Sequence, residues 1–260
     1  MLPRLASNFR SALNTSRPLH PPALPCSSRS FSTAPPPEEG APEGAPCALF
    51  EEALAHLSSS PPSLPPAISL LARSAAGGSP DGNFFLGMAY DNVLPGSPEH
   101  LDRDEGAAVR CYRRAAEKDH AQAMFNLALS LRDGGGGDVE EGFDWMRRAA
   151  DTGDVRAQYN AGIARDPNHK PWGVPGRDML EKDGGEAVKF YRMAAEGGHS
   201  KAEVNLGVAL YTGTGVEADK AEAERLWRGV VEREEEGATQ ARFCLNNMEK
   251  RGEFTTKVPQ

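Results

Sequence analysis

The chain repeats one sequence unit four times, and this repetition constrains its fold more than any other feature. Each unit contains a pair of small residues, and successive pairs are separated by 34, 45 and 36 residues. The pairs are Ala115-Ala116, Ala149-Ala150, Ala194-Ala195 and Val230-Val231. The helices expected in each unit have too little apolar surface to be stable alone in water. A stack of such helix pairs can bury one continuous apolar seam. The repetition therefore predicts an all-α solenoid.

Aspartates mark the expected start of the second helix in each unit. One stands eleven residues before the first member of each small pair, and in three of the four units a Glu follows it three residues later. This spacing resembles a capping box, in which the Asp side chain accepts hydrogen bonds from backbone N–H groups that lack a partner inside the helix. We expect such caps at Asp104, Asp138, Asp183 and Asp219.

Two further positions recur in register. The second helix carries an aromatic slot, filled by Tyr112, Trp145, Phe190-Tyr191 and Trp227. The first helix carries an asparagine, at Asn126, Asn160 and Asn205, followed two residues later by Ala128, Gly162 and Gly207. Small residues at this place let neighbouring helices approach closely.

This pattern resembles the Sel-one-like repeat, a short relative of the tetratricopeptide repeat. The last unit carries most of the signature, in Leu206, Gly207, Tyr211, Gly213, Gly215, Val216, Asp219 and Ala223. The resemblance covers about Pro80 to Gly252 and implies a right-handed superhelical solenoid of antiparallel helix pairs. It also implies a scaffold for protein–protein interaction, although such solenoids serve many unrelated pathways. Organellar members of the family include assembly proteins of respiratory complexes and stress-signalling adaptors.

The amino terminus has the composition of an organelle targeting peptide. Before Glu38, the first acidic residue, the chain has four arginines and many serines. The sequence Arg29-Ser30-Phe31-Ser32 resembles a mitochondrial processing site, which predicts a presequence of residues 1–31 cut between Phe31 and Ser32. We expect a mitochondrial location, with the matrix favoured. A chloroplast address and a disordered tail of accidental composition are the alternatives.

Composition sets the remaining boundaries. Residues 32–46 form a Pro/Gly-rich linker that cannot bury a core, 47–79 a degenerate amino-terminal helix pair, 80–252 the repeat solenoid and 253–260 a polar tail. In the last helix, Ala238 to Lys250, we expect Phe243, Leu245 and Met248 to face inward.

The charge of the chain limits its partners. The formal net charge is −8, and removing the four arginines of residues 1–31 lowers it to −12. An acidic solenoid without a basic patch is not expected to bind nucleic acid, because that binding requires Lys and Arg to neutralise phosphates. A protein with a basic surface is the favoured partner. No apolar run reaches the roughly 18 residues of a membrane span, and the oligomeric state stays open.

Nothing in the sequence predicts catalysis, a metal site or a cofactor. The cysteines beyond residue 31 have no paired spacing, and His120 and His199 share a position with Asp154, which indicates helix caps rather than metal ligands. The glycine run 134–137 lacks the Lys of a phosphate loop. We therefore expect a non-enzymatic adaptor or assembly factor. A structural subunit of a large organellar complex and a hydrolase are the alternatives.

Two features could carry partner recognition. The asparagines Asn126, Asn160 and Asn205 lie on successive first helices, which line the concave surface in solenoids of this type. Their amides either bind the backbone of an extended peptide or hold the repeat stack together. The insertion Asp166 to Lys182, which produces the 45-residue spacing, contains Trp172. This Trp is either an exposed anchor for a partner or folds back over adjacent helices.

Overall fold

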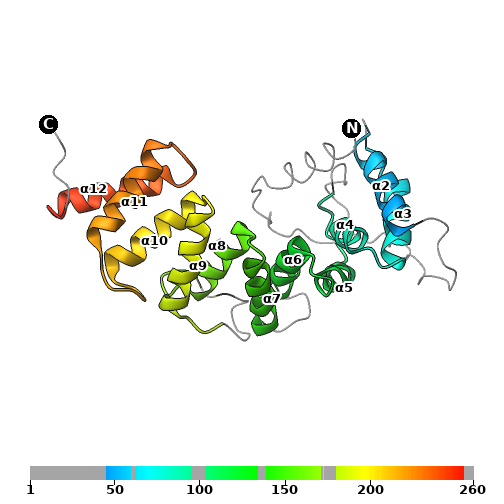
Figure 1. The fold of residues 1–260 in the computed structure, drawn as a ribbon, viewed down its shortest axis with the longest axis horizontal. Coiled ribbons are helices and arrows are strands. Elements are labelled where there is room, and N and C mark those ends of the chain that lie inside the picture. The colour runs from blue at the N-terminus through cyan, green and yellow to red at the C-terminus, as the bar shows by residue number, and fades with distance from the viewer. Residues whose placement is uncertain are drawn as a thin grey trace, which may run out of the picture.

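The computed structural model describes residues 45–59, 62–94, 103–133, 139–170, 172 and 180–254. Within these ranges the chain forms eleven α-helices and no strand (Figure 1), so the prediction of an all-α fold is confirmed. In chain order the helices are α2 (Pro46–Leu57), α3 (Leu64–Ala76), α4 (Pro80–Tyr90), α5 (Glu105–Ala116), α6 (Ala121–Arg132), α7 (Val139–Asp151), α8 (Val155–Arg165), α9 (Gly184–Glu196), α10 (Ser200–Thr212), α11 (Lys220–Glu232) and α12 (Ala238–Lys250). The predicted presequence, with its cleavage site at Phe31 and Ser32, lies outside the described residues.

The helices are stacked in the order of the chain. Each of α3 to α11 packs chiefly against the helix before it and the helix after it, which is the contact pattern of a solenoid. Figure 1 shows an elongated arc, with α4, α6 and α8 on its inner side and α5, α7 and α9 on its outer side. The four repeats are thus α4–α5, α6–α7, α8–α9 and α10–α11. The helices α2 and α3 pack on each other ahead of them.

Aspartate caps fix where the second helices begin. The side chains of Asp104, Asp183 and Asp219 accept hydrogen bonds from backbone N–H groups in the first turns of α5, α9 and α11, as predicted. The fourth predicted cap, Asp138, lies outside the described residues. Because these caps satisfy N–H groups that have no partner inside the helix, they define the helix starts from local sequence alone.

Histidines replace aspartate at the start of two first helices. His120 accepts a hydrogen bond from the Ala123 N–H through Nδ1 at 3.1 Å, and His199 accepts one from the Ala202 N–H at 3.3 Å. Asp154 does the same for α8. The capping interpretation of both histidines is confirmed.

Within three repeats, the aromatic ring of the second helix lies directly on a glycine of the first helix. A Cβ atom added to Gly162 would lie 2.5 Å from the ring atom Cδ1 of Tyr191, too close for two carbon atoms unless one of them moves. The helices can approach this closely only because the glycine has no side chain. The contacting pairs are Gly87 with Tyr112, Gly162 with Tyr191, and Gly207 with Trp227.

The second repeat fills the same slot differently. In the other repeats the ring stands three residues before the small pair, and in the second repeat this position holds the fully buried Met146. On the first helix, the position of Gly87, Gly162 and Gly207 holds the buried Ala128. Assigning the slot to Trp145 is therefore wrong. The Trp145 ring is half-buried, with the Arg148 guanidinium 4.4 Å from its centroid. A Met side chain is flexible, so it can bend around the Cβ atom of Ala128, whereas a rigid ring could not.

The last helix buries only part of the apolar set expected. Met248 is fully buried and Leu245 partly so, but Phe243 is 65% exposed, so its predicted inward position is wrong. The buried face of α12 contains Ala241, and Phe243 lies two residues further, about 200° around the helix. No described helix follows α12 to cover that side.

We expect Gly162→Ala to lower the free energy of unfolding by about 1–3 kcal/mol, because the added methyl group overpacks a filled site and forces the Tyr191 ring or α8 to shift. Helix propensity alone predicts the opposite sign, since Ala is the better helix former. Urea and thermal unfolding of the full chain, followed by circular dichroism, measure the effect.

Gly229→Ala in α11 is the matched control. Its Cβ would meet only the flexible Arg233 guanidinium, at 3.1 Å, so this change should stabilise the protein by up to about 1 kcal/mol. The double variant Gly162→Ala/Tyr191→Met reproduces the Ala–Met combination of the second repeat and should recover part of the loss. Equal stability of the two alanine variants would contradict the proposed contact.

Candidate functional site

Three of the four first helices share a row of partly exposed positions. It consists of the second, sixth and ninth residues of α6, α8 and α10, a spacing that places them on one face of each helix. Because α6 and α8 lie on the inner side of the arc (Figure 1), we call this set the inner stripe. All of its members are half-buried except Asn205, which is buried. They are Gln122, Asn126, Leu129, Arg156, Asn160, Ile163, Lys201, Asn205 and Val208.

The inner stripe repeats one chemical pattern along the solenoid. Its three positions hold a polar or cationic residue, an asparagine and an aliphatic residue in the repeats of α6, α8 and α10, but not in α4. The cation Arg156 pairs with Asp154 at 2.9 Å and lies over the Phe125 ring, 5.0 Å from its centroid, so it connects two repeats. An alternation of aliphatic and polar groups suits contact with another polypeptide better than binding of a small charged ligand.

The three asparagines of the stripe differ in their surroundings. Asn160 donates to the carbonyl oxygen of Arg156 in its own helix at 2.8 Å. Asn126 lies beside the hydroxyl of Tyr112 in the preceding repeat, where its amide opposes the rise in the pKa of that phenol.

Asn205 is 6% exposed, and its amide opposes the rise in the pKa of Tyr159 and of Tyr191. Its amide nitrogen makes no hydrogen bond of normal geometry among the described residues. Asn126 and Asn205 thus lie between repeats. Asn205 is too buried to reach a partner.

Buried tyrosines bind carboxylates at the ends of the first helices. The Tyr112 hydroxyl donates to Asp91 at 2.8 Å, and the Tyr191 hydroxyl donates to Asp166 at 2.9 Å. Asp91 and Asp166 each follow the last residue of a first helix, α4 and α8. Burial and the adjacent carboxylate raise the pKa of both phenols, so these groups stay protonated. Sequence reasoning missed both aspartates, although each follows its first helix at the same place.

Asp166 stays ionised although it is buried. Burial raises the pKa of this carboxyl, but hydrogen bonds from the His169 ring, the Asn168 N–H and Tyr191 outweigh that effect and lower the pKa below its ordinary value. The pair of Asp166 and Tyr191 is therefore a fixed hydrogen bond between an anion and a neutral phenol, which holds α9 on the end of α8. It is not arranged for proton transfer.

Trp172 in the insertion is buried rather than displayed. It is 3% exposed, and the Arg132 guanidinium of α6 lies 5.0 Å from its ring centroid. Its interpretation as an exposed anchor is therefore wrong, and the alternative, that it folds back over adjacent helices, describes the structure. Lys182, at the other end of the insertion, donates to the carbonyls of Ala164 and Lys170 at 3.1 Å. Residues 171 and 173–179 lie outside the described part.

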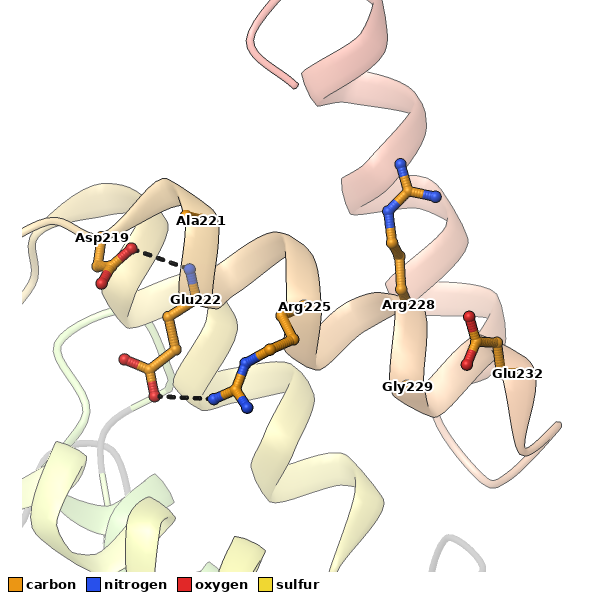
Figure 2. Close-up of a pocket in the computed structure, with 7 residues that line it drawn as sticks. All are labelled: Asp219, Ala221, Glu222, Arg225, Arg228, Gly229 and Glu232. Atoms are coloured by element: carbon orange, nitrogen blue, oxygen red, sulfur yellow. Dashed lines mark hydrogen bonds and ion pairs between the residues drawn. The ribbon is translucent and has the colours of Figure 1, made fainter. Parts of the chain in front are cut away.

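A shallow hollow runs along one face of α11 (Figure 2), but its lining does not form a binding site. Asp219 caps the helix, and Glu222 pairs with Arg225 at 3.7 Å. Arg228 pairs with the buried Glu224 at 2.8 Å. The charges along the hollow are largely satisfied within α11 itself, and they do not converge on a common point.

The described residues contain no metal-binding cluster and no candidate membrane span. Three or more His, Cys, Asp or Glu side chains do not meet there in a group that could hold a metal ion. In the same ranges, no helix combines the length and the apolar composition needed to cross a membrane.

The sequence matches the Sel1 repeat family at residues 80–120, 121–154, 172–199 and 200–228. Among curated proteins, the chain is 30% identical over 164 residues to a chitin synthase regulator, SKT5, of Malassezia restricta. That match covers 60% of this chain but only 10% of the relative.

Two solved structures share the fold. A Sel1 repeat protein from Oxalobacter formigenes is 24% identical with a TM-score of 0.60, over 82% of this chain and 80% of that one. The protein c5321, a protective antigen of uropathogenic Escherichia coli, is 26% identical with a TM-score of 0.57, over 84% of this chain and 50% of that one.

We expect the solenoid to lose stability as the pH falls through about 6.5, in part because of His199. Burial and the nearby Lys201 lower the pKa of this imidazole, against a smaller opposing effect of Glu236. The unfolded chain therefore binds the proton more readily than the folded one, and the stability is complete only above the unfolded pKa. Protonation also removes the Nδ1 acceptor that caps α10.

His199→Asn keeps a capping side chain but cannot titrate. The fall in melting temperature between pH 7.5 and pH 5.5 should be smaller in this variant than in the unmodified chain. An identical fall in both would show that another group is responsible.

Proposed function

The chain belongs to the Sel1 repeat family, whose members act as protein-interaction scaffolds, and on this premise we propose that it binds a partner protein along the inner stripe without catalysing a reaction. The observation that carries the proposal is the repetition of one open surface on three successive first helices. Packing accounts for the buried residues of α6, α8 and α10. It does not account for the partial exposure of the aliphatic residues Leu129, Ile163 and Val208.

The chemistry of the stripe defines what the partner presents. Leu129, Ile163 and Val208 offer partly exposed aliphatic surface at equal intervals in the repeat. Asn126 and Asn160 offer half-buried amides between them. A segment of polypeptide with apolar side chains and accessible backbone groups complements this arrangement. The buried Asn205 and Trp172 contribute by holding the stack, which is a change from their predicted role in direct contact.

We further propose that the scaffold works in the mitochondrion, as an assembly factor or adaptor for an organellar complex. The Arg-rich, acid-poor composition of residues 1–31 supports the address. The fungal relative is named as a regulator of an enzyme, which is consistent with binding another protein.

The double variant Asn160→Ala/Ile163→Ser, in the centre of the stripe, should reduce recovery of the partner about tenfold or more, because central interface residues carry most of a binding energy. The tagged full chain is expressed in its own cells, and proximity labelling with mass spectrometry quantifies the neighbours. Circular dichroism verifies that the variant is folded.

Lys189→Ser/Arg192→Ser is the matched control, because both residues are exposed on α9, the outer helix of the same repeat. This control should retain the partner. Loss of the partner from the control but not from the stripe variant would place the binding surface on the outer side of the arc.

Sequencing of the mature amino terminus tests the address separately. We expect the protein recovered from cells to begin at or near Ser32 and to be found in the mitochondrial fraction. Replacement of Arg29 by Ala should impair the cut. An uncut chain in the cytosol would refute the location and leave the scaffold proposal to be tested on its own.

A further inference from the structure

Helix α8, in the middle of the arc (Figure 1), buries less apolar surface than the first helices on either side of it. Its buried residues are Ala157, Gln158, Ala161, Gly162 and Ala164, and none of them is apolar and larger than alanine. In contrast, α6 buries four apolar side chains larger than alanine and α10 buries three, namely Met124, Phe125, Leu127 and Leu131 on α6 and Val204, Leu206 and Leu210 on α10. Because a helix in a protein is stabilised mainly by the apolar face that it packs, α8 is held the least strongly of the three.

The apolar core is divided at this helix. One group of buried side chains extends from α2 to α8 and includes Phe190 of α9, and a second group extends from Ala187 to Met248. The buried alanines of α8 belong to the first group, whereas its partly buried Tyr159 and Ile163 pack against the second. In a solenoid each unit contacts only its neighbours, so a weakly held unit can open while the units on both sides stay folded.

Polar contacts hold the carboxyl end of α8 in place of a large apolar side chain. The Tyr191 hydroxyl of α9 donates to Asp166, directly after α8, at 2.9 Å. The Lys182 ammonium donates to the carbonyl oxygen of Ala164 at 3.1 Å. We call Asp166, Lys182 and Tyr191 the α8 clasp. Water can replace each of these contacts when the helix opens, so the net stabilisation from the clasp is small and the opening is reversible.

We propose that α8 opens reversibly within the folded solenoid, that the α8 clasp holds it closed, and that the centre of the inner stripe forms only in the closed state. The central stripe residues Arg156, Asn160 and Ile163 all lie on α8. A partner that binds them therefore shifts the population toward the closed state. The part that concerns the partner rests on the proposed function. The opening of α8 does not.

Hydrogen exchange of the full chain, followed by mass spectrometry, tests the opening. The amide hydrogens in the middle of α8 should exchange at least about tenfold faster than those in the middle of α6 and α10. Their rate should also change little in low concentrations of urea, because a local opening exposes little surface. Equal protection of the three helices, or a urea dependence in α8 as steep as that in α6, would overturn the proposal.

Tyr191→Phe tests the clasp, since it removes only the hydroxyl group and keeps the ring on Gly162. Exchange in α8 should become about tenfold faster, because a hydrogen bond to a charged group is lost, while exchange in α6 and α10 stays unchanged. Tyr112→Phe is the matched control. It removes the equivalent bond to Asp91 in the first repeat and should leave exchange in α8 unchanged. Equal acceleration of all three helices by Tyr191→Phe, or acceleration of α8 by the control, would contradict the role of the clasp.

The exchange measurement requires no partner, so the opening of α8 and the proposed function fail separately. Slow exchange in α8 would overturn the opening and leave the binding surface on the inner stripe to be tested by partner recovery. Fast local exchange together with a stripe variant that keeps its partner would support the opening and refute only the proposed function. If both hold, a recovered partner added in excess should slow exchange in α8, and unchanged exchange would overturn the link to the closed state.

Discussion

The contact between an aromatic ring of the second helix and a glycine of the first helix determines how the rest of the solenoid is arranged. It sets the distance between the two helices of a repeat, because the ring fills the space that a side chain would occupy on the first helix. Once the Tyr191 ring is fixed on Gly162, its hydroxyl lies at the end of α8, where it donates to Asp166. One steric contact thus places one hydrogen bond, and both hold the repeat together.

The same contact explains why the asparagines behave differently. Where the slot holds a tyrosine, as at Tyr191, its hydroxyl lies at the boundary with the next repeat, and Asn205 turns toward it. Where the slot holds Met146, no hydroxyl is present, and Asn160 binds the carbonyl of Arg156 in its own helix. The asparagine position is therefore a packing position first. Its amide is free for other roles only to the extent that the neighbouring slot leaves it unused.

Local rules made the fold, the helix starts and the capping histidines predictable from the sequence, since a cap depends on a few consecutive residues. The slot in the second repeat was misassigned because Trp145 and Met146 are adjacent, and residue type was given more weight than helix phase. The register of the repeat identifies Met146 as the slot residue, because Met146 stands three residues before Ala149, as Tyr112 stands three before Ala115. In a helix, a shift of one residue rotates a side chain by about 100° and moves it out of the seam.

Phe243 was predicted wrongly, and Trp172 was left between two alternatives, for the opposite reason: no repeating neighbour defines their surroundings. Trp172 is covered because Arg132 of α6 lies over its ring, whereas Phe243 has no such cover among the described residues. Positions that packing dictates are shared by every repeat and cannot distinguish this solenoid from its relatives. Apart from the asparagines, the identities of the stripe residues are not dictated by packing, and neither are those of the residues at the uncovered end. Selectivity for a partner therefore has to reside there, because only those residues can change without loss of the fold.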